Sequence, residues 1–265
     1  MSAPSYAGRV LEVILDTARE RARALDSAAL VAAAEEMPPP RNFAAALAVP
    51  GLSVVAEIKR RSPSAGDIDP DLDAVEQAGA YVEGGAAAVS VLTEPRFFDG
   101  SLDDLTAVRE SVEVPVLRKD FTVDPSQIWE ARAAGADAVL VIVAAVDDVL
   151  LADLLAACDA AALSALVEVH AESECERAVA AGARVVGVNN RDLRTFVTDP
   201  SVAERLAPML RGVAVTVAES GVGSDEMARR MEAAGYDAIL VGEALVRASD
   251  PRRMVSMLAG RRDRT

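Results

Sequence analysis

A short run of apolar and β-branched residues, followed by an Ala-rich helical stretch, recurs eight times along this chain. No other feature of the sequence narrows the choice of fold as far. Eight units between residues 53 and 245 give about 24 residues each, close to the minimum for a strand and its crossover helix. Eight such units predict parallel strands closed into a (β/α)8 barrel. The runs occupy residues 53–59, 87–94, 115–121, 138–146, 164–170, 185–191, 214–220 and 238–245.

Four of the helical stretches end alike, in "AGAYVEGG", "ARAAGAD", "AVAAGAR" and "MEAAGYD". We interpret each Gly as a left-handed cap that ends a helix and leads the chain into the next strand. The rival α/β fold is a doubly wound open sheet, which would need a Gly-rich dinucleotide turn after the first strand. The stretch "KRRSPSAG" at 59–66 is not such a turn, so the barrel is preferred.

The sequence before the repeat predicts an amphipathic helix over residues 8–35, because Val10, Leu11, Ile14, Leu15 and Ala18 form one stripe. Three prolines in "EEMPPPRNF" end this helix. We therefore expect one domain over residues 1–265, with a helical extension at 8–35, a linker at 36–48 and the barrel at 49–260. A hydrophobic content of 51% is enough to give a domain of this size a core.

Charged side chains end several of the predicted strands. Strand residues alternate between two faces, so Glu57 and Lys59 share the inward face of the first strand. Charges near a barrel interior are costly to desolvate and add little net stability when paired, whereas the face formed by the C-terminal ends of the strands is where barrel enzymes keep their active sites. We therefore interpret the group as catalytic. Its other members, at the ends of later runs, are Lys119, Glu168, Asn189, Glu219 and Ser220.

Lysine is rare in this chain. Of 27 basic residues only Lys59 and Lys119 are lysine, and arginine takes every other basic position. A lysine can lose its proton at workable pH, whereas an arginine stays charged. The two positions that kept lysine are thus candidates for proton transfer.

Glycines in the loops after the seventh and eighth runs predict an anion site. Gly221 follows the seventh run, Gly242 lies in the eighth, and both precede predicted helix starts, the usual place of a phosphate in this fold. Ser62 and Ser64 supply further hydroxyl donors. Glu243 fits beside a phosphate only if its backbone N–H points inward and its side chain points away.

Several motifs, in order and without large gaps over residues 8–260, resemble those of indole-3-glycerol phosphate synthase. They are "AEIKRRSPSAG", "SVLTEPRFFDGS", "VLRKDF", "LVEVH", "GVNNRDL", "VAESGV" and "VGEAL". The resemblance implies a (β/α)8 barrel with an N-terminal helical extension and no metal or cofactor. It implies a carboxy-lyase that closes the ring of 1-(o-carboxyphenylamino)-1-deoxyribulose 5-phosphate, then decarboxylates and dehydrates it, in tryptophan biosynthesis.

The resemblance also implies roles. Lys119 would be the general acid of ring closure, Lys59 would contact the departing carboxylate, and Asn189 would hold a sugar hydroxyl. Glu57 and Glu168 would manage the later protons, and which of them or Lys59 drives dehydration stays open. Binding roles would fall to residues around the phosphate, the sugar and the aromatic ring: Ser62, Gly221, Gly242 and Glu243 for phosphate, Arg191, Glu219 and Ser220 on the sugar side, and Phe98 and Phe121 against the ring.

Two details depart from this picture. "AGDID" stands where a Lys-Gly pair is frequent in the family, and no role carries over to His170, the single histidine, for which we expect a supporting hydrogen bond. The alternatives are a phosphosugar isomerase of the same fold, a Schiff-base aldolase using Lys119, and a non-catalytic phosphosugar-binding paralogue. An isomerase needs a Cys or carboxylate base and an Asp acid at strand ends, yet Cys158 and Cys175 both lie in predicted helices.

The net charge of −15 argues against nucleic acid or an anionic membrane as partner. No apolar run reaches membrane-spanning length, and the first residues lack a basic region followed by an apolar core, so we expect neither a transmembrane helix nor a signal peptide. No residues have the spacing of metal ligands, and the two cysteines form no disulfide framework. We expect a cytoplasmic enzyme, monomeric or weakly homo-oligomeric, that acts on a small phosphosugar.

Overall fold

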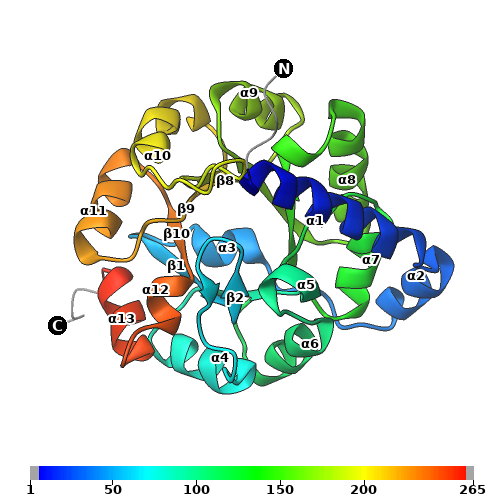
Figure 1. Ribbon diagram of the computed structural model, residues 1–265, viewed down its shortest axis with the longest axis horizontal. Helices are drawn as coiled ribbons and strands as arrows, with labels where there is room; N and C mark the ends of the chain where they lie inside the picture. Colours follow the sequence, from blue (N-terminus) through cyan, green and yellow to red (C-terminus); the bar gives the residue numbers. More distant parts are fainter. Residues whose placement is uncertain (1–5, 261–265) are drawn as a thin grey trace.

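The computed structural model describes residues 6–260 and confirms the barrel. Eight parallel strands close in the order β1-β10-β9-β8-β7-β6-β5-β4, with helices around them (Figure 1). Each strand lies within one of the eight predicted runs. Their bounds are β1 Ser53–Ile58, β4 Ala88–Leu92, β5 Val116–Lys119, β6 Ala138–Ile142, β7 Ser164–Val169, β8 Val185–Asn189, β9 Val215–Glu219 and β10 Ala238–Val241.

The outer helices follow the strands as the repeat predicts. Polar residues begin several of them: the Asp73 carboxylate accepts from the amides of Val75 and Glu76 at the start of α4. At all four predicted helix ends a glycine has a positive φ, between +79° and +97°, which confirms the left-handed caps. The outer helices are α4 Ala74–Glu83, α6 Leu102–Ser111, α7 Ser126–Ala133, α8 Asp148–Ala160, α9 Glu172–Ala180, α10 Ser201–Leu206, α11 Asp225–Ala234 and α13 Pro251–Leu258.

Short strands, helices and 3-10 turns lie in the loops between the barrel strands and the outer helices. A two-stranded antiparallel sheet follows β1, which the sequence did not predict. These elements are β2 Arg61–Ser62, β3 Gly66–Asp67, α5 Pro95–Phe98, α12 Glu243–Val246, and the 3-10 turns η1 Val143–Ala145 and η2 Ala207–Leu210.

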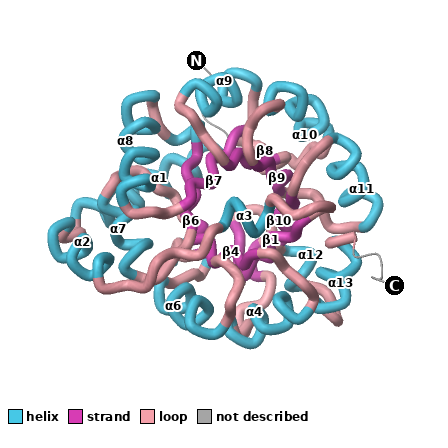
Figure 2. The backbone as a smooth tube through the Cα atoms, turned by 180° about the vertical axis from the view of Figure 1, so that it is seen from behind, coloured by secondary structure: helices cyan, strands magenta, loops and turns pink. Residues whose placement is uncertain are grey.

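The structure corrects the predicted N-terminal extension in two ways. The single helix predicted over 8–35 is two helices, α1 Tyr6–Arg23 and α2 Ser27–Glu35, because the Asp26 carboxylate caps the second by accepting from the amides of Ala28 and Ala29. The predicted linker at 36–48 contains a further helix, α3 Phe43–Leu47, capped by Asn42. α1 lies over one end of the barrel (Figure 1), and α3 covers the other (Figure 2).

Two apolar cores result from the alternation of strand residues. The outer core lies between strands and helices and includes Val54, Ala56 and Ile58, which alternate along β1 with the inward-facing Val55 and Glu57. The inner core fills the barrel, where Val55 packs with Leu117 from β5, and is continuous with side chains of α1 and α3. Within the described residues, no helix is long and apolar enough to cross a membrane.

Candidate active site

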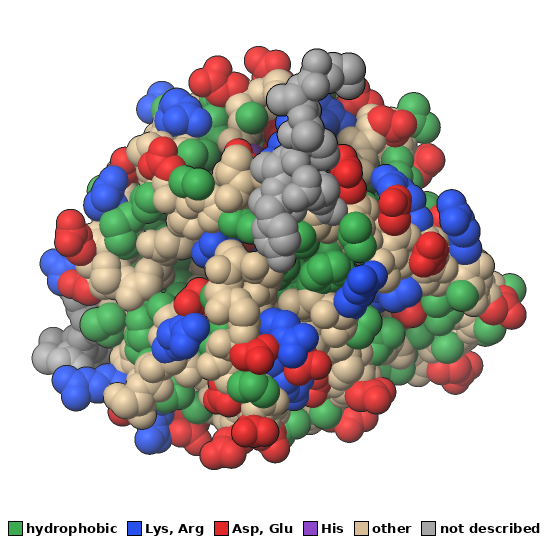
Figure 3. All heavy atoms as spheres, in the orientation of Figure 1, with side chains coloured by type: hydrophobic (Ala, Val, Ile, Leu, Met, Phe, Trp, Pro, Cys, Tyr) green, Lys and Arg blue, Asp and Glu red, His purple; other side chains and the backbone are tan. Residues whose placement is uncertain are grey.

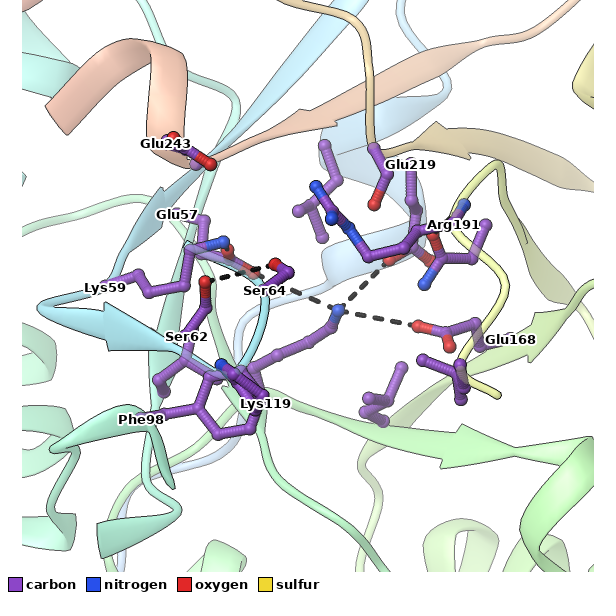
Figure 4. Close-up of a pocket in the computed structure, with 18 of the residues that line it drawn as sticks. Glu57, Lys59, Ser62, Ser64, Phe98, Lys119, Glu168, Arg191, Glu219 and Glu243 are labelled. Atoms are coloured by element: carbon purple, nitrogen blue, oxygen red, sulfur yellow. Dashed lines mark hydrogen bonds and ion pairs between the residues drawn. The ribbon is translucent and has the colours of Figure 1, made fainter. Parts of the chain in front are cut away.

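A cavity of about 460 Å³ opens at the C-terminal ends of the strands. Figure 4 shows charged side chains from several strands converging in it. All fourteen site residues predicted from the sequence line this one cavity. They are Glu57, Lys59, Ser62, Phe98, Lys119, Phe121, Glu168, Asn189, Arg191, Glu219, Ser220, Gly221, Gly242 and Glu243.

Lys119 lies at the centre of the charged group. Its Nζ is 3.1 Å from Glu219 Oε2, 3.5 Å from Glu168 Oε2 and 3.9 Å from Glu57 Oε2. Lys59 Nζ donates to Glu57 Oε1 at 2.7 Å. The three carboxylates are 4% exposed or less, so they meet the lysines out of contact with bulk water.

The proximity of these groups sets their protonation. Burial favours the neutral form of Lys119, but Glu219, Glu168 and Glu57 outweigh it and raise the pKa of this ammonium. Burial likewise raises the pKa of Glu57, yet Lys59 and Lys119 bring it below its usual range. Lys119 is thus protonated and Glu57 ionised at neutral pH, an acid beside a base.

Glu219 differs from the other carboxylates. Burial raises its pKa to about 7, since the attraction of Lys119 is countered by the charges of Glu168 and Glu57. In the pairing of β8 with β9, Asn189 lies opposite Glu219. Gly187, two residues before Asn189, leaves room for the Glu219 carboxylate, with which a Cβ at this position would collide. Gly187 therefore makes the space that Glu219 occupies.

The loops after β9 and β10 border the other side of the cavity. Ser220 and Gly221 both have left-handed backbone, with φ of +62° and +76°. A Cβ at Gly242, directly after β10, would collide with the Glu57 carboxylate and lie 3.1 Å from Lys59 Nζ, so any other residue here would have to displace this pair. The Glu243 carboxylate accepts from Arg247 Nε at 3.0 Å, one turn along α12.

An apolar wall lines part of the same cavity, and the sequence predicted only some of its residues. The Phe98 and Phe121 rings lie 6.2 Å apart at a tilt of 40°. Leu11 and Ile14 from α1 line the same cavity, and so do Leu193 and Phe196 from the loop after β8, with Arg247 at the edge. For α1 the only signal was its apolar stripe, which indicates burial against an unspecified surface.

α1 is held over the cavity by an ion pair with the barrel. Arg21 donates to both oxygens of Asp120, at 2.8 and 3.1 Å, and Asp120 also accepts from Thr93 and Arg118. Asp120 directly follows Lys119, so the same strand end carries the central lysine and fixes the helix. Within residues 6–260, no group of three or more His, Cys, Asp or Glu side chains is arranged to hold a metal ion.

Comparison with solved structures supports the fold. The chain superposes on 3-hexulose-6-phosphate synthase with a TM-score of 0.61 and 21% identity, over 78% of this chain and 98% of that one. A thiamine phosphate pyrophosphorylase from Pyrococcus furiosus gives a TM-score of 0.59 and 21% identity, over 82% and 96%. At these identities the likeness shows the fold alone.

Comparison with sequences shows the family. The sequence profile of indole-3-glycerol phosphate synthase matches residues 10–258. A protein of that name from Mycolicibacterium smegmatis is 50% identical over 95% of this chain and 88% of its own length. One from Mycobacterium tuberculosis is 47% identical over 97% and 95%. With its barrel, its cavity and these relatives, the chain belongs to the indole-3-glycerol phosphate synthase family.

Proposed function

We propose that the cavity at the strand ends is where this chain does the family's chemistry, and we assign its residues to the steps. As a member of the family, the chain is a carboxy-lyase of tryptophan biosynthesis. It turns 1-(o-carboxyphenylamino)-1-deoxyribulose 5-phosphate into indole-3-glycerol phosphate, carbon dioxide and water. The observation that carries the assignment is the group of two lysines and three buried glutamates at the ends of four strands, β1, β5, β7 and β9.

Lys119 is the general acid of ring closure. A ring carbon attacks the substrate carbonyl, and the oxygen that gains negative charge needs a proton. The Lys119 ammonium, kept charged by three carboxylates, is a donor that requires no reorganisation when this charge develops.

Lys59 and Glu57 act next to the departing carboxylate. The Lys59 ammonium attracts the substrate carboxylate until it leaves as carbon dioxide, and Glu57, 2.7 Å away, holds that ammonium in place. After decarboxylation the same ammonium lies where it can protonate the leaving hydroxyl.

Glu168 takes the ring proton that completes dehydration. Burial raises its pKa, but Lys119 and His170 lower it, so the carboxylate is ionised and able to accept a proton. Asn189, which follows on the neighbouring strand β8, holds a sugar hydroxyl. Glu219, with its pKa near 7, and the neighbouring Arg191 and Ser220 bind the sugar side.

The substrate's two ends bind on opposite sides of the cavity. The phosphate is surrounded by Ser62, Gly221, Gly242 and the amide of Glu243. The negative charge of Glu243 is tolerated beside the phosphate because its carboxylate accepts a hydrogen bond from Arg247. Phe98, Phe121 and the wall from α1 contact the aromatic ring.

A direct assay tests the assignment. Purified protein is mixed with the carboxyphenylamino-deoxyribulose phosphate, and formation of the indole product is followed by fluorescence. Glu168→Gln keeps the size of the side chain but removes the base, so we expect a loss in kcat of about 10²–10⁴-fold. A Glu168→Gln enzyme with the parent's kcat would remove Glu168 from this role.

An isomerase of the same fold gains no support from the cavity. Both cysteines pack in the outer core, Cys158 on α8 and Cys175 on α9. Burial raises the pKa of both thiols, to about 12 and about 11, so neither is a ready base.

We further propose that residues 1–265 work as one domain, in the cytoplasm, as a monomer or weak homo-oligomer, without metal, cofactor or nucleic acid. The net charge of −15 supports a partner other than nucleic acid. Acidic and basic side chains alternate on the face of the molecule shown in Figure 3, which lacks a uniform basic patch over the part that is described.

A further inference from the structure

The single histidine of the chain lies just behind the cavity, between two carboxylates. His170 follows the last residue of β7 and does not line the cavity. Its Nε2 lies 3.2 Å from Glu168 Oε1, and its Nδ1 lies 3.2 Å from Glu174 Oε2. Glu168 reaches it from inside the barrel, and Glu174 from the first turn of α9.

The orientation of the ring is fixed by Glu174. The backbone N–H of His170 donates to Glu174 Oε2 at 2.7 Å, and Nδ1 faces the same oxygen. The imidazole is thereby held with its other nitrogen toward Glu168. Across residues 6–260, neither His170 Nε2 nor Glu168 Oε1 makes a hydrogen bond of good geometry, and the contact that joins them is the ion pair at 3.2 Å.

This geometry decides the charge of the ring. A neutral imidazole carries one N–H, and an Nδ1 that donates to Glu174 leaves Nε2 as an acceptor. Nε2 would then face a carboxylate oxygen, so two lone pairs would meet in a site that is 2% exposed on the Glu168 side. Only an imidazolium, with an N–H on both nitrogens, satisfies both carboxylates.

Glu168 is consequently held by one cation on each oxygen. Oε2 faces Lys119 Nζ at 3.5 Å and Oε1 faces His170 at 3.2 Å. Among the described residues, the charged groups that face His170 are Glu168 from β7 and Glu174 from α9. Beyond Glu168 lie Lys119, Glu57 and Glu219, of which the two glutamates oppose its ionisation.

We propose that His170 is a positioning residue: as an imidazolium oriented by Glu174, it keeps Glu168 ionised and aimed at the substrate. This rests on the proposed role of Glu168 as the base. When Glu168 takes the ring proton, the imidazolium stays charged. Glu168 then releases that proton to solvent, and the nearby imidazolium favours the ionised carboxylate that results. The pKa of His170 is consistent with a charged ring: burial lowers it, but the two glutamates outweigh burial and raise it to about 10.

The protonation state can be observed directly, because the chain has one histidine. Protein labelled with ¹⁵N, with any histidine tag removed, gives one set of imidazole signals in a long-range ¹H–¹⁵N spectrum. We expect both ring nitrogens to be protonated at pH 7–8 and the midpoint to lie well above the usual value of about 6.5. A neutral imidazole at pH 7 would overturn the proposal.

Glu174→Gln tests the orienting carboxylate, with Glu176→Gln as its matched control. Both substitutions remove one charge from α9, but only Glu174 faces His170. Glu174→Gln should lower the midpoint of the imidazole titration, and Glu176→Gln should leave it at the parent's value. Equal midpoints in all three proteins would remove Glu174 from the arrangement. Because Glu174 is half-buried and outside the cavity, this comparison stands even if substitutions at His170 hinder folding.

The kinetic test is the pH profile of kcat/KM for His170→Asn. Without the imidazolium the pKa of Glu168 should rise, so the acid limb should move to higher pH by about 1–3 units. A structural defect would instead lower the rate equally at every pH, and an unmoved limb would overturn the proposal. Glu168→Gln distinguishes the role of Glu168 from that of His170. A fully active Glu168→Gln enzyme would refute Glu168 as the base. An inactive Glu168→Gln enzyme, together with a His170→Asn enzyme whose acid limb is unchanged, would refute the role of His170 alone.

Discussion

Replacing Lys119 with arginine separates the charge of this residue from its proton. The three carboxylates within 3.9 Å of Nζ need a cation, and a guanidinium provides one. The longer side chain has room in a cavity of about 460 Å³. We therefore expect Lys119→Arg to fold, with a change in unfolding free energy of no more than about 2 kcal/mol.

Catalysis should respond very differently. A guanidinium holds its proton tightly and presents a wide planar fork in place of the compact Lys119 ammonium, so it is a poor acid for the single carbonyl oxygen of ring closure. The expected loss in kcat is about 10²–10⁴-fold, which is about 3–5 kcal/mol of transition-state stabilisation. KM should change less, because the proton is needed mainly in the transition state.

Lys59→Arg is the matched comparison, since it makes the same substitution 2.7 Å from Glu57 in the same cavity. We expect it to raise KM more and to lower kcat less, if Lys59 mainly holds the substrate carboxylate. The measurements are kcat and KM for both variants, with circular dichroism to confirm folding. A folded Lys119→Arg enzyme whose kcat is within about tenfold of the parent's would refute the assignment of Lys119 as the acid.

Three further predictions follow from the site. Gly221→Asp should raise KM, because its carboxylate would repel the phosphate. Gly221→Ala places a side chain at the same φ of +76° without the charge, so it should raise KM far less, and equal KM values for the two variants would place the phosphate elsewhere. Between about pH 4.3 and pH 7, Glu219 is protonated in the folded protein but ionised in the unfolded chain. Its contribution to the unfolding free energy therefore falls as the pH rises through this window. Glu219→Gln should therefore gain about 1–3 kcal/mol of unfolding free energy relative to the parent between pH 5 and pH 8, and urea titrations that show a constant difference would contradict this. Turnover should continue in a chelator, and loss of activity that a divalent ion restores would refute the metal-free mechanism.

The strands and the inward charges were predictable because they depend on local alternation. Glu57 and Lys119 are 62 positions apart in sequence but were placed together by two rules: strand residues alternate, and parallel strand ends meet at one face. The contact of Lys119 with Glu219 then follows from closure of the barrel. The separations and the pKa values needed the structure, because they depend on side-chain positions.

What the sequence missed depends on contacts between distant segments. The break at Asp26 lies within a pattern that is Ala-rich on both sides, so the local signal for one helix outweighed the cap. Leu193 and Phe196 belong to a polar loop, and only the fold shows that they line the cavity. The position of α1 depends on Arg21 and Asp120, which are 99 residues apart.

The pairing of β1 with β10 has a consequence for how the protein is made. β1 is the first barrel strand to leave the ribosome and β10 the last, so β1 has an unpaired edge until residue 241 has been synthesised. Contacts so distant in sequence form slowly, and an open strand edge invites association with other chains. A nascent chain that stops before β10 already contains Glu57, Lys59, Lys119, Glu168 and Glu219, yet it lacks Gly242 and the strand that would bring both edges together. We therefore expect the chain to bind the phosphosugar only after β10 has closed the barrel.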